Sequence, residues 1–205
     1  IGAGRVVMQY LLRFAREDWA KNKPLNKFIA DVKRDGGIVH FAGLMSDGRV
    51  HSDVRDEMKI AKYVLDSGLR VCIHFIGDGR DTPPKSALKY VRTIKRMLAP
   101  YFADGRAFFG TLSGRHWTMD RNKNMDRTEL AFNALAHAKS DQTADSIESA
   151  IKDSYAAGVT DEFFKPTVIV PTKITKHDGF IFGNYRSDRA RQIVRAMLDT
   201  GAHML

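Results

Sequence analysis

The chain has 205 residues, of which 43% are hydrophobic and 28% are charged, and its formal net charge is +9. This length and composition are typical of a globular protein with a full core, which excludes an intrinsically disordered chain. No apolar run approaches the roughly 20 residues that span a bilayer, and the first residues lack a signal-peptide pattern, so we expect a cytoplasmic protein with no membrane partner.

The first half of the chain alternates between helical and strand-like patterns. Helical spacing of apolar residues predicts an opening helix, and a second helix follows Pro24 and ends at Gly36. Two continuous apolar runs then have the character of buried strands, each followed by an amphipathic helix. The predicted helices cover 5–19, 25–34, 53–68 and 85–98, and the predicted strands cover 38–45 and 69–77.

The second half repeats the same order of strand, loop and helix. This order predicts an α/β fold with three layers (α/β/α), a mainly parallel sheet and right-handed crossovers. Neither an interdomain linker nor an internal repeat is visible, so we expect a single domain over 1–205. The predicted strands cover 106–112, short stretches near 167–175, and 179–185, and the predicted helices cover 126–138, 143–157 and 189–198.

Six arginines follow strand-like runs, in loops rich in Gly, Asp and Ser. A guanidinium presents a rigid fork of donors that matches the two oxygens of a carboxylate or phosphate. Several such groups in these loops indicate a small polyanionic ligand, and we interpret them as a site for a phosphorylated acid. The six are Arg80, Arg115, Arg121, Arg186, Arg189 and Arg191.

The loops that carry these polar groups are expected to meet at one edge of the sheet. Ligands of open α/β sheets bind outside the carboxyl ends of the strands, where loops and helix N-termini converge. The alternative is that each arginine only pairs with a neighbouring carboxylate or a helix carbonyl. Loop by loop, the candidates are His51; Arg80 and Asp81; Arg115 and Arg121; and Arg186 and Arg189.

The basic excess also admits a rival function. A pI near 9.7 suits a nucleic-acid or other polyanion-binding module built on an α/β frame. However, the chain has no zinc-finger spacing, no RNA-recognition sheet signature and no convincing helix-turn-helix. We therefore expect no nucleic-acid partner.

Cys72 is the one cysteine of the chain and lies inside an apolar run. This placement predicts a buried, inert thiol, with no disulfide framework and no cysteine-based zinc site. His40 and His74 lie within predicted strands, and we expect both to be core histidines with satisfied hydrogen bonds.

Five motifs occur along the chain in the order GLMSDGRVHSD, DGRDTPPKSALKY, SGRHWTMDRN, TDEFFKP and NYRSDRARQ. They resemble the motifs MGLxSDGGVHSH, DGRDTPP, SGRYYAMDRD, TDEF and NFRPDRARQ of the cofactor-independent (2,3-bisphosphoglycerate-independent) phosphoglycerate mutases. DGRDTPP and RSDRARQ are the specific ones, and the match covers nearly the whole chain. The chain resembles the inserted phosphotransferase domain of this family rather than the complete enzyme.

The resemblance implies a division of roles among the candidate residues. His51 would contact the phosphoryl group in transit, and Asp81 would be the acid/base that moves the proton on the glycerate hydroxyl. Asp78 competes for the second role, but we expect it to tie the turn or to pair locally. The groups that would bind the carboxylate and phosphate oxygens are Arg80, Arg115, Arg121, Arg186 and Arg189.

The resemblance also implies a partner domain that these motifs do not contain. In the family, an alkaline-phosphatase-like domain carries the serine that takes the phosphoryl group and two divalent metal ions, of the Mn²⁺ type. We expect residues 1–20 to be a linker helix to that domain and this chain to hold no metal or other cofactor. The full protein would be an isomerase of glycolysis and gluconeogenesis that interconverts 3- and 2-phosphoglycerate, whereas this chain alone would be inactive. A phosphopentose mutase that shares this domain is a further alternative.

The chain departs from the family motifs at several positions. Arg49 replaces the second glycine of SDGG, and Asp53 replaces the histidine after the serine. His116 and Trp117 replace the aromatic pair after SGR, and Ser187 replaces a proline. These departures indicate that the loop before His51 and the fine substrate contacts differ from the family pattern.

Overall fold

The computed structural model describes residues 18–205. Within this range, one six-stranded sheet has the order β4-β3-β2-β1-β5-β6, and every neighbouring pair is parallel except β3 and β4. The predicted mainly parallel sheet is therefore confirmed. The strands are β1 (Val39–Leu44), β2 (Val71–Gly77), β3 (Ala107–Gly114), β4 (Thr167–Val168), β5 (Gly179–Phe182) and β6 (His203–Met204).

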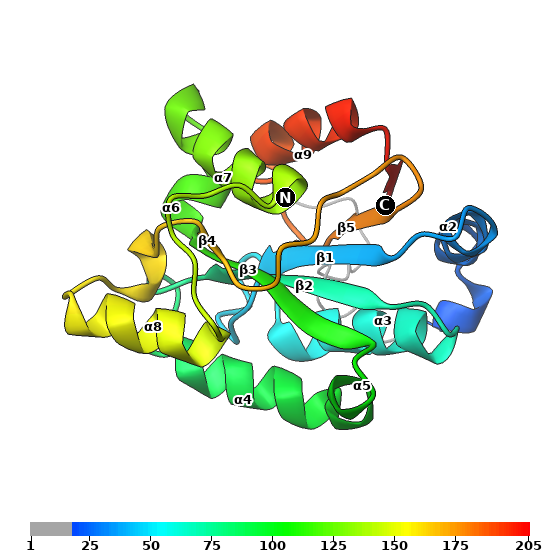
Figure 1. The fold of residues 1–205 in the computed structure, drawn as a ribbon, viewed down its shortest axis with the longest axis horizontal. Coiled ribbons are helices and arrows are strands. Elements are labelled where there is room, and N and C mark those ends of the chain that lie inside the picture. The colour runs from blue at the N-terminus through cyan, green and yellow to red at the C-terminus, as the bar shows by residue number, and fades with distance from the viewer. Residues whose placement is uncertain (1–17) are drawn as a thin grey trace, which may run out of the picture.

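Helices cover both faces of the sheet, as predicted (Figure 1). The α-helices are α2 (Lys23–Arg34), α3 (Val54–Asp66), α4 (Ala87–Met97), α5 (Ala99–Ala103), α6 (Arg115–Thr118), α7 (Met125–His137), α8 (Ile147–Ala156) and α9 (Arg191–Met197). Three short 3-10 helices are η1 (Trp19–Lys21), η2 (Asp161–Phe163) and η3 (Leu198–Thr200). Helices α3, α4 and α5 lie on one side of the sheet in Figure 1, and α7 and α9 lie on the other.

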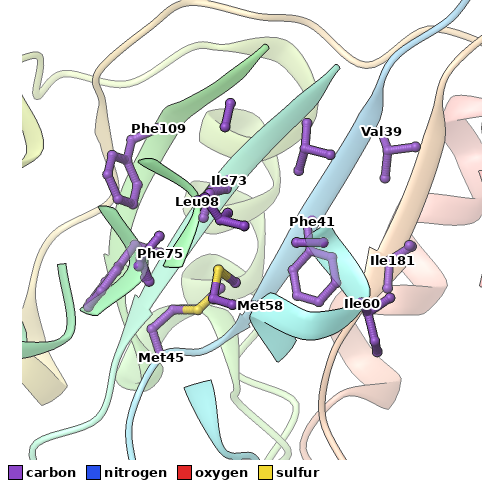
Figure 2. Packing of buried hydrophobic residues seen from close by; sticks show 14 of the residues in the cluster. Val39, Phe41, Met45, Met58, Ile60, Ile73, Phe75, Leu98, Phe109 and Ile181 are labelled. Carbon is purple, nitrogen blue, oxygen red and sulfur yellow. The ribbon is translucent and has the colours of Figure 1, made fainter. Parts of the chain in front are cut away.

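Alternation along the strands divides the core into two clusters. In β1, Val39 and Phe41 pack in the cluster that contains α3 and α4, whereas Ala42 and Leu44 pack with α7 and α9. Figure 2 shows Phe41 beside Met58 and Ile181 in the first cluster. Both faces of the central strands are buried, which explains why these strands appear in the sequence as continuous apolar runs.

Polar caps and a glycine fix the ends of helices that pack on the sheet. The Asn22 side chain accepts a hydrogen bond from the backbone N–H of Leu25 (3.0 Å) and begins α2, and Asp53 caps α3 through the N–H of Arg55 (3.0 Å). After α2, Gly36 has φ +71° and turns the chain toward β1. Local sequence chemistry therefore agrees with the tertiary arrangement.

Several predicted elements differ from the structure. The strands predicted near 167–175 reduce to β4, and the segment 169–178 is irregular, because Pro171 cannot donate to a ladder and Val170 is exposed. β5 ends at Phe182 instead of continuing to 185, so the NYRSDR motif lies in a loop. The helix predicted over 143–157 begins only at Ile147. The short edge strand β6 was not predicted.

Two further findings concern the predicted first helix and membrane crossing. The helix predicted over 5–19 lies almost entirely outside the described residues. Among residues 18–205, no helix has the length and apolar character that crossing a membrane requires.

Candidate functional site

Asp78 organises the loop that follows β2. Its Oδ1 accepts the backbone N–H groups of Arg80 (3.2 Å) and Asp81 (3.0 Å), and its Oδ2 accepts the hydroxyl of Ser46 (2.6 Å). Burial alone would raise the pKa of this carboxyl, but the hydrogen bonds from Ser46 and the backbone and the ion pair with Arg115 hold the pKa below its usual value. The expectation that Asp78 ties the turn is confirmed, and it also joins the loops after β1 and β2.

Arg115 connects this turn to the end of β3. Its side chain is 3% exposed, and its Nη1 lies 2.7 Å from Asp78 Oδ1 and 2.7 Å from Asp81 Oδ2. Burial lowers the pKa of the guanidinium, and the two carboxylates more than compensate, so the pKa lies above its usual value. Arg115 is therefore a permanent buried cation that positions the carboxylate of Asp81.

His51 lies beside the same carboxylate. Its Nε2 is 3.9 Å from Asp81 Oδ2, and its side chain is buried. Burial and the nearby charge of Arg115 lower the pKa of His51, against the opposing effect of Asp81, so the imidazole is neutral at pH 7. Its Nδ1 has no hydrogen-bond partner among the described residues. The structure thus brings the two predicted catalytic residues together.

Asp188 bridges two of the predicted arginines. Its Oδ2 lies 2.8 Å from Nη1 of Arg121 and 3.1 Å from Nη2 of Arg186, and about half of each arginine side chain is exposed. The buried Oδ1 of Asp188 has no partner among the described residues. Arg121 and Arg186 are therefore held by the same protein carboxylate.

Arg80 is mostly exposed and has one long ion pair. Its Nη1 is 3.6 Å from Glu162 Oε1, and 60% of its side chain is exposed. Glu162 belongs to η2, which is anchored next to the Arg80 loop because Asp161 accepts the N–H of Ser86 (2.9 Å) and the hydroxyl of Tyr155 (2.5 Å).

Arg189 shows that the cations of this edge are close enough to repel one another. Its Nη1 donates to the carbonyl of Met119 (3.4 Å), which belongs to the segment after β3. The pKa of Arg189 is lowered first by burial and then by the charges of Arg115, Arg121 and Arg80, and Asp188 offsets this only in part. Positively charged groups from three loops therefore lie near one another around Arg189.

The loops after β1 and β5 are also joined to each other. The backbone N–H of Tyr185 donates to the carbonyl of His51 (2.6 Å), and the N–H of Leu44 donates to the Asn184 side chain (3.2 Å). Arg49, which stands where the family motif has glycine, has φ +59°, a left-handed conformation that favours glycine. Its Nε donates to Asp53 Oδ2 (2.9 Å), which holds the loop before His51 in this conformation.

The predicted residues are thus distributed over one rim. Arg191 is the exception, because it begins α9 and is exposed. Each of the other arginines has a protein partner, as the alternative interpretation required, but the partners join different loops instead of lying next to the arginine alone. Sequence reasoning gave no role to Ser46, Glu162 and Asp188, although all three lie within the quoted motifs.

The two strand histidines are buried, but one expectation about them is wrong. Nε2 of His40 is buried without a hydrogen-bond partner among the described residues, so this histidine is not fully satisfied. Burial lowers the pKa of His40 to about 4. Burial also raises the pKa of the Cys72 thiol, in agreement with the expected inert thiol.

Comparison with known sequences gives a consistent result. The sequence profile described as "BPG-independent PGAM N-terminus" matches residues 13–204. A 2,3-bisphosphoglycerate-independent phosphoglycerate mutase of Ehrlichia ruminantium (strain Welgevonden) is 40% identical over 203 residues, and one of Clostridium novyi (strain NT) is 41% identical over 209 residues. Each match covers 97% of this chain and 40% of the relative, so the chain spans about 40% of the length of these curated relatives.

Comparison with solved structures supports the fold. A chain from the work titled "Crystal structures of Leishmania mexicana phosphoglycerate mutase at low cobalt concentration" superposes with a TM-score of 0.89 and 24% sequence identity. The superposition covers 99% of this chain and 42% of the Leishmania chain.

Proposed function

The chain belongs to the family of 2,3-bisphosphoglycerate-independent phosphoglycerate mutases, and from this membership we propose that it is the substrate-binding part of such an enzyme. In this proposal, the full protein is a cytoplasmic isomerase that interconverts 3-phosphoglycerate and 2-phosphoglycerate in glycolysis and gluconeogenesis. The chain itself is a single domain that holds the glycerate, and residues 1–20 link it to the rest of the protein.

The observation that carries the proposal is the crowding of guanidinium groups around Arg189. Bringing like charges together is unfavourable, and after burial the charges of Arg115, Arg121 and Arg80 lower the pKa of Arg189 further. A bound carboxylate or phosphate would relieve this repulsion, and forked donors match both groups. In this proposal the substrate oxygens are held by Arg80, Arg115, Arg121, Arg186 and Arg189.

Asp81 and His51 are placed for the chemistry beside these cations. We assign to Asp81 the transfer of the proton on the glycerate hydroxyl, because Arg115 fixes its carboxylate at 2.7 Å and its side chain remains 19% exposed. Asp78 is unsuited to this role, since it is buried and both its oxygens are engaged. We assign to His51 the contact with the phosphoryl group in transit, which its neutral imidazole can make by hydrogen bonding.

The rim does not suit the two Mn²⁺-type ions that the family reaction requires. It is lined by guanidinium groups, and the carboxylates of Asp78 and Asp81 are paired with Arg115. We therefore propose that the ions and the phosphoryl-accepting serine belong to a phosphatase-like domain of the full-length protein. It follows that this chain alone binds phosphoglycerate weakly and has no mutase turnover, which a sensitive coupled assay of the purified chain would check.

An NMR titration of the chain with 3-phosphoglycerate tests the assignment. We expect saturable shifts at His51, Asp81, Arg115 and Arg189, and weaker binding by Arg186→Ala of about tenfold or more, because a charge-assisted hydrogen bond contributes about 1.5–3 kcal/mol. Arg34→Ala is the matched control, since Arg34 is also exposed and paired with aspartates, but lies on α2. Its affinity should equal that of the wild type.

Two parallel ligands separate the alternatives. A short oligonucleotide that binds more tightly than phosphoglycerate, with an affinity that falls steeply with salt, would show that the arginines serve nucleic acid. Tighter binding of a phosphopentose would point to a different mutase. Equal binding by the Arg186→Ala variant and the wild type would contradict the assigned role of the rim.

A further inference from the structure

Three buried side chains with metal-binding atoms meet on the strands, away from the arginine rim. His40 comes from β1, and Cys72 and His74 come from β2, and each side chain is at most 1% exposed. Nδ1 of His40 lies 2.9 Å from Nε2 of His74, and Sγ of Cys72 lies 3.7 Å from the same Nε2. All three ligand atoms lie within 4.8 Å of one another. The phosphoglycerate site proposed above uses none of these residues.

These separations are close to those around a tetrahedral metal ion. With Zn–N distances of about 2.0–2.1 Å and a Zn–S distance of about 2.3 Å, two nitrogen ligands lie about 3.3 Å apart, and a nitrogen and a sulfur lie about 3.6 Å apart. The observed distances of 2.9 and 3.7 Å differ from these values by a few tenths of an ångström. The remaining pair, His40 and Cys72, lies within 4.8 Å, so side-chain rotation would be needed to place one ion among the three atoms.

The surroundings of His74 already fit a ligating histidine. Its Nδ1 lies 2.9 Å from the hydroxyl of Thr111 on β3. When Nδ1 donates to this hydroxyl, the lone pair of Nε2 points to the other two ligand atoms, which is the arrangement that outer partners impose on metal-bound histidines. The rings of His40 and His74 lie nearly parallel, with an interplanar angle of 13°.

Charges of both signs lie near the cluster. Asp178 is close enough to act on both His40 and Cys72, and its negative charge raises the pKa of each. A divalent ion bound to a Cys72 thiolate has a net charge of +1, which Asp178 would balance. Arg70 is the opposing charge, because it lowers the pKa of Cys72. The effect of Arg70 on Cys72 is larger than that of Asp178 and smaller than that of burial.

The cover over the cluster is an irregular segment. Thr172 is close enough to Cys72 to lower the pKa of the thiol. It belongs to 169–178, the stretch between β4 and β5 that has neither helix nor strand and is drawn in orange in Figure 1. Its neighbours Pro171 and Lys173 are exposed. An ion can therefore reach the cluster by local opening of this segment, while the helices and the sheet stay in place.

We propose that His40, Cys72 and His74 form a structural binding site for one borderline divalent transition-metal ion, with Zn²⁺ as the best fit. Two imidazoles and one thiolate select such an ion over Mg²⁺, Ca²⁺ and Mn²⁺, which prefer oxygen ligands. Binding converts the thiol to a thiolate and releases one proton to solvent, and a water molecule completes the tetrahedron. The site ties β1 to β2 and replaces the expectation of a chain without metal.

Co²⁺ provides a direct test, because it takes the same geometry as Zn²⁺ and its bond to a thiolate gives a charge-transfer absorption band. Cys72 is the one cysteine among all 205 residues, so such a band can arise from this site alone. The chelator-treated chain should develop the band with one equivalent of Co²⁺, and one equivalent of Zn²⁺ should abolish it. Cys72→Ala should lack the band, and His177→Gln, a change at an exposed histidine, should retain it.

Refolding in the presence of Co²⁺ lets the ion bind before the three side chains are buried. The chain is unfolded in urea and refolded with Co²⁺, and native circular dichroism is verified. Absence of the band in this refolded protein would overturn the proposal. Cobalt binding without the band would also overturn it, because such binding indicates adventitious surface sites. Thr111→Val should fold and weaken cobalt binding by about 10–100-fold, because it removes the outer partner of His74. Unchanged cobalt affinity in this variant would contradict the assigned geometry.

Discussion

The arginine rim and the sheet interior handle ionisable groups in opposite ways. At the rim, even the buried Asp78 is ionised, because Arg115 and three hydrogen bonds hold its carboxylate. In the interior, Glu57 on α3 is fully buried, and neither of its carboxyl oxygens has a partner among the described residues. Burial, followed by the charges of Asp53 and Asp56, raises the pKa of Glu57 well above its usual value. A buried carboxyl is thus charged where a cation meets it and neutral where none does.

The two regions also differ in how the backbone makes room for these groups. Glu57 lies against Gly43 of β1 and against Gly183, and a Cβ at Gly43 would come within 2.1 Å of Glu57 Oε1. In the interior, the two glycines leave room for the side chain of Glu57. At the rim, side chains from four loops lie together. The following changes test this difference between the rim and the interior.

The largest effect is expected from Arg115→Met. The variant leaves Asp78 and Asp81 without their shared cation, and removal of one partner from a buried ion pair costs about 3–5 kcal/mol. The free energy of unfolding from urea denaturation at pH 7 measures this loss. Adding Asp78→Asn should recover part of it. A loss below about 1 kcal/mol would mean that the rim does not depend on paired charge.

Glu57→Gln tests the neutral carboxyl of the interior. The pKa of Glu57 is raised by folding, so its stabilising effect is present below the unfolded value of about 4.3 and is lost as the pH rises toward the folded value. The glutamine variant should therefore gain stability relative to wild type, by up to about 1.4 kcal/mol per pH unit above pH 4.3. Urea denaturation between pH 5 and pH 8 measures the gain. The exposed Glu129→Gln serves as control, and parallel curves for both variants would contradict a neutral Glu57.

His51→Gln should change the pH dependence of stability by a smaller amount. The pKa of His51 is lowered by burial and by Arg115, so the folded state excludes a proton that the unfolded chain binds below about pH 6.5. Wild-type stability should consequently fall by about 1 kcal/mol more than that of the variant between pH 7.5 and pH 5.5. Thermal denaturation at the two pH values measures the difference, with His177→Gln as control. Identical pH dependence in wild type and variant would show that folding leaves the pKa of His51 unchanged.

Arg121→Gln should have the smallest effect on stability. Its ion pair with Asp188 is about half exposed, and such pairs contribute less than about 1 kcal/mol. Arg34→Gln on α2 should cost a similar amount in urea denaturation. If Arg121→Gln cost more than about 2 kcal/mol, the rim arginines would be structural groups, and ligand binding would not be their main role.

Local pattern and topology together predicted much of this structure. The strand over 69–77 and the loop after it could be recognised because both faces of β2 are buried and Asp78 begins the turn. The convergence of Arg115 with Asp81 followed from the rule that parallel strands end at one edge. These features depend on residue type and order, which the sequence states directly.

Other features depend on distances between segments, which the sequence does not state. Asp188 lies between two arginines in RSDR, so the sequence pattern was equally compatible with a purely local pairing. In the structure Asp188 also binds Arg121, which is 67 residues away. The meeting of His40 with Cys72 requires the register of β1 against β2, which pairs these two residues directly. The irregular course of 169–178 follows from Pro171 and the exposed Val170, although the apolar residues of this stretch favoured a strand.

The order of the sheet has a consequence for the behaviour of the chain at high concentration. In the part of the chain that the structure describes, both outer strands, β4 and β6, contain only two residues. A long open edge offers backbone groups that recruit a strand from another molecule and start aggregation. Here β1 and β2 have a paired strand on each side, and β4 pairs with Thr111 and Leu112 of β3, so the two outermost strands offer only short edges to an approaching molecule.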